Sequence, residues 1–258
     1  MKALGRVALA APLVGLLLLA GCAAPASDSP APEAAASEPA GEVTVFAAAS
    51  LRTAFDDIAT AFTAENPGVT VNPIVYDGSS TLVTQLQEGA RADVLATADE
   101  RNMQDLVDTG LAAEPQLFAT NTLVIAVPVG NPAGVSGLAD LADAVTVLCA
   151  PAVPCGAAST QLLDAAGVDV TAASLEQNVT AVLQKVAAGE ADAGLVYATD
   201  VIGDDAVSSV VPDGAAEVVN RYPIVTLDGS NAAGAAFVDF VLSAKGQQIM
   251  SDHGFGAP

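Results

Sequence analysis

The stretch 43–51 constrains the fold most, because it has the pattern of a buried strand that runs directly into a helix. Val43, Val45 and the small residues after them suit a parallel strand covered on both faces. From 51 to 65, apolar residues recur every three or four positions, which predicts an amphipathic helix. Ser50 lies at the expected N-cap. Its hydroxyl, beside the free N–H groups of a helix N-terminus, would suit an anion, although a serine that only caps the helix has the same pattern.

A second strand–serine–helix unit follows the first. Residues 69–76 predict a strand, 77–80 a turn that contains Ser79, and 81–90 an amphipathic helix. Ligands of open α/β sheets bind at the carboxyl ends of parallel strands. Both serines are therefore expected at such an edge.

The rest of the chain alternates strands with helices, which is typical of α/β proteins. The predicted strands are 92–97, 122–127, 145–149 and 193–197. The predicted helices are 100–109, 157–166, 179–188 with Asn178 as its cap, and 233–253.

The N-terminus has the pattern of a secretion signal, with a basic start and an apolar stretch at 7–19 that is too short to span a bilayer comfortably. Leu-Ala-Gly-Cys at 19–22 looks like a bacterial lipobox. We therefore expect a lipoprotein signal peptide at 1–21 and acylation of Cys22, which would anchor an exported protein to the outer face of the cell membrane. An ordinary signal peptide with a chance cysteine is the alternative. Residues 22–41 predict a flexible linker rich in Ala, Pro and Ser.

The charge is strongly acidic, with 8 basic and 30 acidic residues and a net charge of −22 at pH 7. Such a protein repels nucleic acid and anionic lipid headgroups. If it binds an anion, local dipoles must hold that anion against the overall field.

The residues that common catalytic sites require are missing from the sequence. The single histidine, His253, lies near the C-terminus, and neither a Gly-x-Ser-x-Gly nor a Ser-x-x-Lys motif occurs. A serine nucleophile would therefore lack its base. Zinc and copper sites also lack ligands. Besides Cys22, the cysteines are Cys149 and Cys155, six positions apart around a Pro-rich turn. They could form a disulfide or remain two buried thiols.

Several motifs together resemble the periplasmic molybdate-binding proteins that serve ABC transporters, over about 42–255. The motifs are Val-Phe-Ala-Ala-Ala-Ser-Leu at 45–51, Gly-Ser-Ser-Thr-Leu at 78–82, the segment 92–99, Val-Pro-Cys-Gly at 153–156 and Gly-Leu-Val-Tyr-Ala-Thr-Asp at 194–200. The resemblance implies a two-lobed α/β periplasmic-binding-protein fold of type II, in which each lobe is a mainly parallel sheet flanked by helices. The first lobe would be 42–121 with 221–258 and the second 122–220. Strands near Leu123 and Tyr222 would cross between them.

The resemblance also implies how the ligand is bound. Ser50 and Ser79 would donate hydroxyls, Cys155 and Val179 backbone N–H groups, and Tyr197 its phenol, to molybdate or tungstate in a cleft between the lobes. No catalytic residue, resident metal cation or other cofactor is implied. The expected partner is the permease of an ABC importer, and the expected state is a monomer. Position 155 is commonly alanine in relatives, but a main-chain contact tolerates cysteine.

Asp77 departs from this pattern, because it would place a carboxylate close to a bound anion. We expect it to cap the turn or to face solvent; a carboxylate directed into the cleft would weaken the assignment. A cleft of donors alone should reject hydrogenphosphate, whose O–H would find no acceptor. Sulfate must be rejected by size.

Three alternatives remain open from the sequence. A sulfate or ferric-ion receptor could share the fold, although Tyr76, Tyr197 and Tyr222 are not adjacent in sequence, which argues against ferric iron. An exported enzyme could use Ser50 or Ser79, but it would need a base. A scaffold lipoprotein would bind no small molecule.

Overall fold

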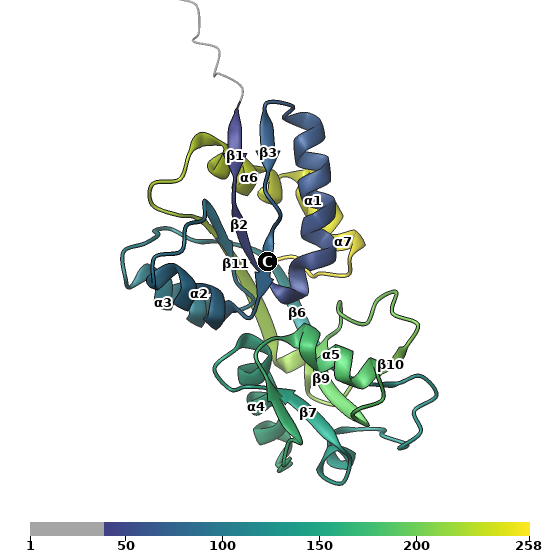
Figure 1. Cartoon of the computed structure of the whole chain (residues 1–258). Helices are drawn as coiled ribbons and strands as arrows, with labels where there is room; N and C mark the ends of the chain where they lie inside the picture. The colour runs from purple at the N-terminus through teal and green to yellow at the C-terminus, as the bar shows by residue number, and fades with distance from the viewer. Residues whose placement is uncertain (1–38) are drawn as a thin grey trace, which may run out of the picture. The chain divides into compact units, whose positions relative to one another are not determined.

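The computed structural model describes residues 39–258, which form two α/β lobes joined by two long strands (Figure 1). The expected signal peptide, the lipidation site Cys22 and most of the expected linker lie outside the described residues. Within 39–258, no helix combines the length and apolarity needed to cross a membrane.

The first lobe contains three parallel strands in the order β4, β2, β5. They are β2 (Val45–Ala48), β4 (Val75–Asp77) and β5 (Val94–Ala96). A smaller parallel pair consists of β1 (Gly41–Val43) and β3 (Val69–Val71). The helices of this lobe are α1 (Arg52–Glu65), α2 (Ser79–Gln87), α3 (Glu100–Val107), α6 (Ala232–Leu242) and α7 (Ala244–Asp252). Its core includes edge-to-face aromatic contacts, such as Phe62 of α1 against Phe237 and Phe240 of α6.

The second lobe extends the sheet in the order β9, β7, β8. These strands are β7 (Thr146–Cys149), β8 (Ser174–Glu176) and β9 (Ala193–Tyr197), all mutually parallel. Its helices are α4 (Pro154–Ala166) and α5 (Val179–Ala187), with the short turns η2 (Leu138–Ala142) and η3 (Ala215–Glu217). The edge strand β10 (Val207–Val210) pairs antiparallel with the end of β6.

Two antiparallel strands connect the lobes, namely β6 (Gln116–Pro128) and β11 (Val219–Thr226) (Figure 1). β6 pairs with β11 over its first half and with β9 over its second half, while β11 also pairs with β5. The crossing strands therefore contain Leu123 and Tyr222, as the sequence predicted. The register shifts between Tyr222 and Pro223, because proline has no N–H for the ladder.

Two predicted elements are each divided into two in the structure. The strand expected at 69–76 is divided into β3 and β4, with Pro73 in the break between them. The helix expected at 233–253 is two helices that meet at Ser243, whose backbone is extended and whose side chain accepts the Gly246 N–H of α7 at 3.2 Å. A Cβ at Gly246 would lie 2.2 Å from the Phe240 carbonyl oxygen, so the bend packs the two helices too closely for a larger residue.

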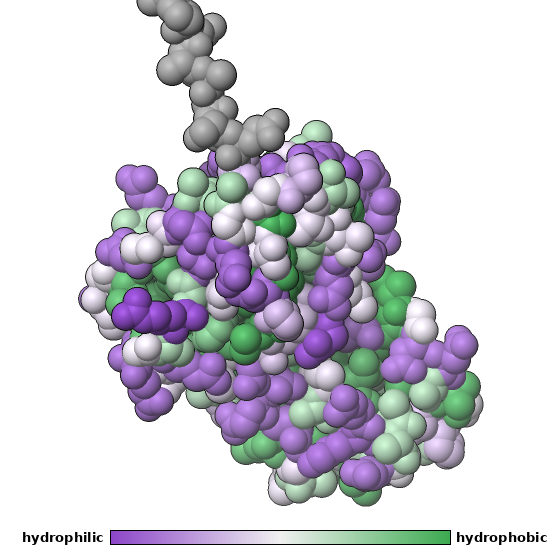
Figure 2. All heavy atoms as spheres, turned by 45° about the horizontal axis from the view of Figure 1, so that its top comes forward, coloured by the Kyte–Doolittle hydropathy of each residue, from purple (hydrophilic) through white to green (hydrophobic). Residues whose placement is uncertain are grey.

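Hydrophilic residues cover much of the face drawn in Figure 2, with smaller apolar groups between them. Because acidic residues outnumber basic ones by 30 to 8, most carboxylates have no cation to pair with. Solvent must therefore stabilise most of this charge.

Candidate functional site

A small cavity lies where loops of both lobes meet. The first lobe contributes residues that follow β2, β4 and β5, and the second contributes the N-termini of α4 and α5 and the end of β9. The lining residues are Ala48, Ala49, Ser50, Asp77, Gly78, Ser79, Ala98, Pro154, Cys155, Asn178, Val179 and Tyr197. All five predicted ligand residues therefore lie around one cavity, at the carboxyl ends of parallel strands.

Ser50 reaches this cavity in a way that the sequence did not predict. It lies inside a short 3₁₀ helix, η1 (Ala49–Leu51), and Leu51 occupies the N-cap of α1, so the prediction of Ser50 as that cap is wrong. The Ser50 hydroxyl instead lies 3.1 Å from the Tyr222 hydroxyl. The side chain is buried, and it is tied to the strand that crosses between the lobes.

Ser79 is the first residue of α2 and is fully buried. Its Oγ accepts the Ala98 N–H at 3.0 Å. Because this contact uses a lone pair of the oxygen, the Ser79 O–H proton remains available to a ligand in the cavity. Gly78 provides the extended N-cap, so the predicted helix at 81–90 begins two residues earlier than expected.

The second lobe presents two helix N-termini to the cavity. Cys155 is the second residue of α4, and Val179 is the first residue of α5. N–H groups in a first helical turn have no intrahelical acceptor, and the helix dipole makes this end positive. Asn178 caps α5 as predicted, accepting the Ala181 N–H at 3.0 Å. A disulfide joins Cys149 at the end of β7 to Cys155, with 5.7 Å between the Cα atoms.

Tyr197 ends β9, and its side chain is 1% exposed. Among the described residues, its hydroxyl is a buried polar group without a hydrogen-bond partner. Burial raises the pKa of Tyr197 well above its usual value, so the phenol keeps its proton and can donate. Its backbone N–H donates to Asp200 at 2.8 Å, which fixes the end of the strand.

Asp77 lines the cavity rather than facing solvent alone. Its Oδ1 accepts the Gly78 N–H at 2.7 Å and the Asn178 side-chain amide at 2.9 Å, so this oxygen is held by one donor from each lobe. The expectation that Asp77 caps the turn is met in part. The cavity is not lined by donors alone, however, and the predicted exclusion of hydrogenphosphate for lack of an acceptor does not follow.

The lining of this cavity contains neither lysine nor arginine, so hydroxyls, backbone N–H groups and helix N-termini are the groups that could hold a small anion there. Sequence reasoning missed Tyr222 as a partner of Ser50 and Asn178 as a partner of Asp77. The amide of Asn178 could have been noticed from its predicted capping position. Ser50 and Tyr222 are 172 residues apart, and no local pattern links them.

The sequence argument against ferric iron also needs correction. Tyr197 and Tyr222 are neighbours in space, with ring centroids 6.0 Å apart. Of the two, Tyr197 lines the cavity, while the Tyr222 hydroxyl contacts Ser50. Burial raises the pKa of both phenols above the usual value, which opposes the phenolate form that a ferric ion would require. Ferric iron therefore stays disfavoured, for a different reason.

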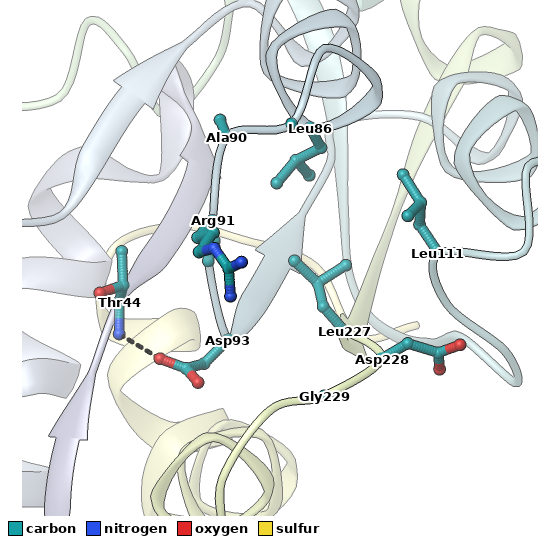
Figure 3. A pocket seen from close by; sticks show the side chains of 11 residues that line it. Thr44, Leu86, Ala90, Arg91, Asp93, Leu111, Leu227, Asp228 and Gly229 are labelled. Atoms are coloured by element: carbon teal, nitrogen blue, oxygen red, sulfur yellow. Dashed lines mark hydrogen bonds between the residues drawn. The ribbon is translucent and has the colours of Figure 1, made fainter.

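A larger hollow lies elsewhere on the first lobe (Figure 3). Arg91, Asp93 and Asp228 give its wall charges of both signs, and none of the five predicted ligand residues lines it. Asp93 accepts the Thr44 N–H at 2.8 Å and so supports the start of β2. This hollow lacks the serine and tyrosine hydroxyls and the helix N-termini that line the cavity between the lobes.

Known proteins are similar to this chain in sequence and in fold. The chain matches the family model described as bacterial extracellular solute-binding protein over residues 43–256. It is 43% identical over 259 residues to the molybdate-binding protein ModA of Mycobacterium tuberculosis, covering 98% of this chain and 99% of that protein. It is 32% identical over 231 residues to ModA of Escherichia coli, covering 83% and 89%. The periplasmic molybdate-binding protein of Azotobacter vinelandii aligns structurally with a TM-score of 0.68 at 20% identity, over 84% of this chain and 99% of that one. The predicted periplasmic-binding-protein fold is confirmed.

Proposed function

The chain belongs to the bacterial extracellular solute-binding proteins, among the ModA molybdate-binding proteins of ABC transporters, and we propose that it captures molybdate for import. It is a transport protein and not an enzyme, so the alternative of serine-dependent catalysis is excluded. We further propose that Ser50, Ser79, Cys155, Val179 and Tyr197 donate hydrogen bonds to the oxyanion, and that tungstate binds in the same way.

The observation that carries this proposal is the buried Tyr197 hydroxyl on the wall of the cavity, which has no hydrogen-bond partner within residues 39–258. Burying a hydroxyl without a hydrogen bond costs about 1–3 kcal/mol. An acceptor bound between Tyr197 and the serines would remove that cost. A dianion suits the site because each charge-assisted bond contributes about 1.5–3 kcal/mol, and helix N-termini add positive ends without a counter-ion.

Calorimetric titration of the protein with molybdate, tungstate, sulfate and phosphate tests the proposed ligand. We expect saturable binding of molybdate and tungstate and much weaker binding of sulfate. Equal binding of sulfate would make the protein a broader oxyanion receptor. Binding of phosphate would give Asp77 the role of an acceptor for a protonated oxyanion. No binding of any of the four would refute the proposed function.

Ser79→Ala tests the binding mode, because it removes one O–H donor from the cavity while the helix can still form. The matched control is Ser80→Ala, in the same helical turn but outside the residues that line the cavity. We expect the Ser79 variant to bind molybdate about tenfold or more weakly, and the Ser80 variant to bind as the wild type. Equal effects of both changes would show that Ser79 makes no contact with the ligand.

The cellular context is also a proposal. We infer that Cys22 is acylated and anchors the protein outside the cell, that 22–41 is a flexible linker, and that the lobes are 42–121 with 221–258 and 122–220. The protein would then act as a monomer beside the permease of its importer. Mass spectrometry of the mature N-terminus tests the anchor: a diacylglyceryl group on Cys22 supports it, and an unmodified cysteine refutes it.

A further inference from the structure

Tyr222 holds a central position behind the site without lining the cavity. It lies on β11 and its side chain has an exposure of 0%. Its ring packs edge-on against Phe118, Tyr197 and Phe255, with centroids 6.3, 6.0 and 5.6 Å away. These rings come from β6, from the end of β9 and from the C-terminal segment, so they restrict the rotation of the phenol.

The direction of the hydrogen bond between Tyr222 and Ser50 follows from which of the two protons would otherwise lack an acceptor. Either oxygen could be the donor at the observed distance of 3.1 Å. Burial raises the pKa of Tyr222 above its usual value, so the phenol is protonated. Among the hydrogen bonds of the described residues, Ser50 Oγ is the acceptor available to that proton. If Ser50 donated instead, the buried tyrosine proton would lose this acceptor, which is unfavourable.

The consequence concerns the single proton of Ser50. When the serine oxygen accepts from Tyr222, its own O–H must point elsewhere, and Ser50 lines the cavity. A chain from the tyrosine to the serine to a bound oxygen would also polarise in one direction, which strengthens each of its hydrogen bonds. Without Tyr222, the serine hydroxyl could rotate toward other acceptors, and ordering it on binding would reduce the affinity.

We propose that Tyr222 is a positioning residue that acts through Ser50, directing the serine proton toward the oxyanion. This inference rests on the proposed function, because it assumes that an oxyanion binds beside Ser50. It assigns a role in binding to a strand that otherwise serves to connect the lobes.

The test is a double-mutant cycle on the full chain, with molybdate affinity measured by calorimetry for Tyr222→Phe, Ser50→Ala and the double variant. We expect Tyr222→Phe to raise Kd about three- to tenfold, and to change Kd less than twofold when Ser50 is already alanine. Tyr76→Phe is the control. The Tyr76 hydroxyl donates to Asp56 at 2.7 Å, away from the cavity, so its loss should leave Kd unchanged.

A structural role alone would give a different result. If Tyr222 only supported the aromatic core, Tyr222→Phe would change Kd by the same factor with or without the Ser50 hydroxyl, and that outcome overturns the inference. Wild-type binding with no effect of Tyr222→Phe also overturns it, while the proposed function stands. A wild-type protein that does not bind molybdate refutes the proposed function and this inference together.

Discussion

Gly78→Ala should keep the two lobes from approaching each other as closely as they do in the structure. Gly78 precedes α2 in the first lobe with φ −61° and ψ 137°, which alanine adopts without strain. A Cβ at this position, however, would lie 2.1 Å from the carbonyl oxygen of Gln177, in the second lobe. An alanine at position 78 therefore fits the backbone of the first lobe, but its side chain collides with the second lobe at the distance seen in the structure.

The size of the effect follows from these distances. Ordinary contacts of a Cβ begin at 3.4 Å, so the lobes must separate by about 1.3 Å at this point. A shift of that size along the bond between Asp77 and Asn178 would lengthen it from 2.9 Å to about 4.2 Å, beyond hydrogen-bond range. The proposed donors of the second lobe would move away from the oxyanion by a similar distance. Losing one charge-assisted bond costs about 1.5–3 kcal/mol, which is about tenfold to 150-fold in Kd.

The assay combines molybdate titration with the thermal melting of the ligand-free protein. We expect Gly78→Ala to raise Kd at least about tenfold and to leave the ligand-free melting temperature within a few degrees of the wild type. Gly137→Ala is the matched control, since its backbone is also extended and a Cβ there meets nothing within 4 Å. Gly78→Ala with wild-type affinity would refute the argument, because it would show that binding does not require the close approach of the lobes.

Three further predictions concern Asp77, Asp200 and the disulfide. Asp77→Asn should tighten molybdate binding in calorimetry, because it removes a negative charge but keeps an acceptor for the Asn178 amide. Weaker binding of this variant would contradict the prediction. Asp77→Ala also removes the contact with Asn178, so it should bind molybdate less tightly than Asp77→Asn. Burial raises the pKa of Asp200 to about 7, so the protonated carboxyl favours the folded state. This contribution to stability is complete below the unfolded pKa of about 3.9 and is lost as the pH rises through about 7. Urea unfolding of Asp200→Asn should therefore show less loss of stability between pH 5 and pH 8 than the wild type, and equal losses would exclude this cause. Reduction of the disulfide between Cys149 and Cys155 should weaken molybdate binding a few-fold, because it frees the turn that presents the Cys155 N–H. The same Kd with and without reductant would show that the helix alone fixes that donor.

The sequence predicted those parts of the molecule that local patterns determine. The apolar spacing at 51–65 and the capping position of Asn178 correspond to α1 and to the start of α5. A helical apolar spacing and an N-cap are both patterns among residues three or four positions apart, so they can be recognised in the sequence. The break at Ser243 was missed because the apolar pattern continues across it, while the bend arises from how closely α6 and α7 pack.

The site was predicted less completely than the fold. The five residues carried over from the resemblance do lie together, but their supporting contacts come from distant segments. Ser79 is bonded to Ala98, and Ser50 to Tyr222, across 19 and 172 residues. Asp77 was expected to cap the turn or to face solvent. Its hydrogen bond with Asn178 of the second lobe depends on how the two lobes meet. Such contacts are set by tertiary packing, which leaves no periodic signal in the chain.

The pairing of β6 with β11 has a consequence for how such a receptor can be altered. Thr122 and Val219 are directly opposite each other in the ladder, where the chain leaves for the second lobe and where it returns. A segment whose two ends are neighbours can be replaced as one cassette without moving the ends of its host. Three of the five proposed donors, on Cys155, Val179 and Tyr197, would travel with that cassette. Two crossovers between relatives, one at each end of this segment, could thus exchange one wall of the cavity while the Ser50 and Ser79 wall stays as it is.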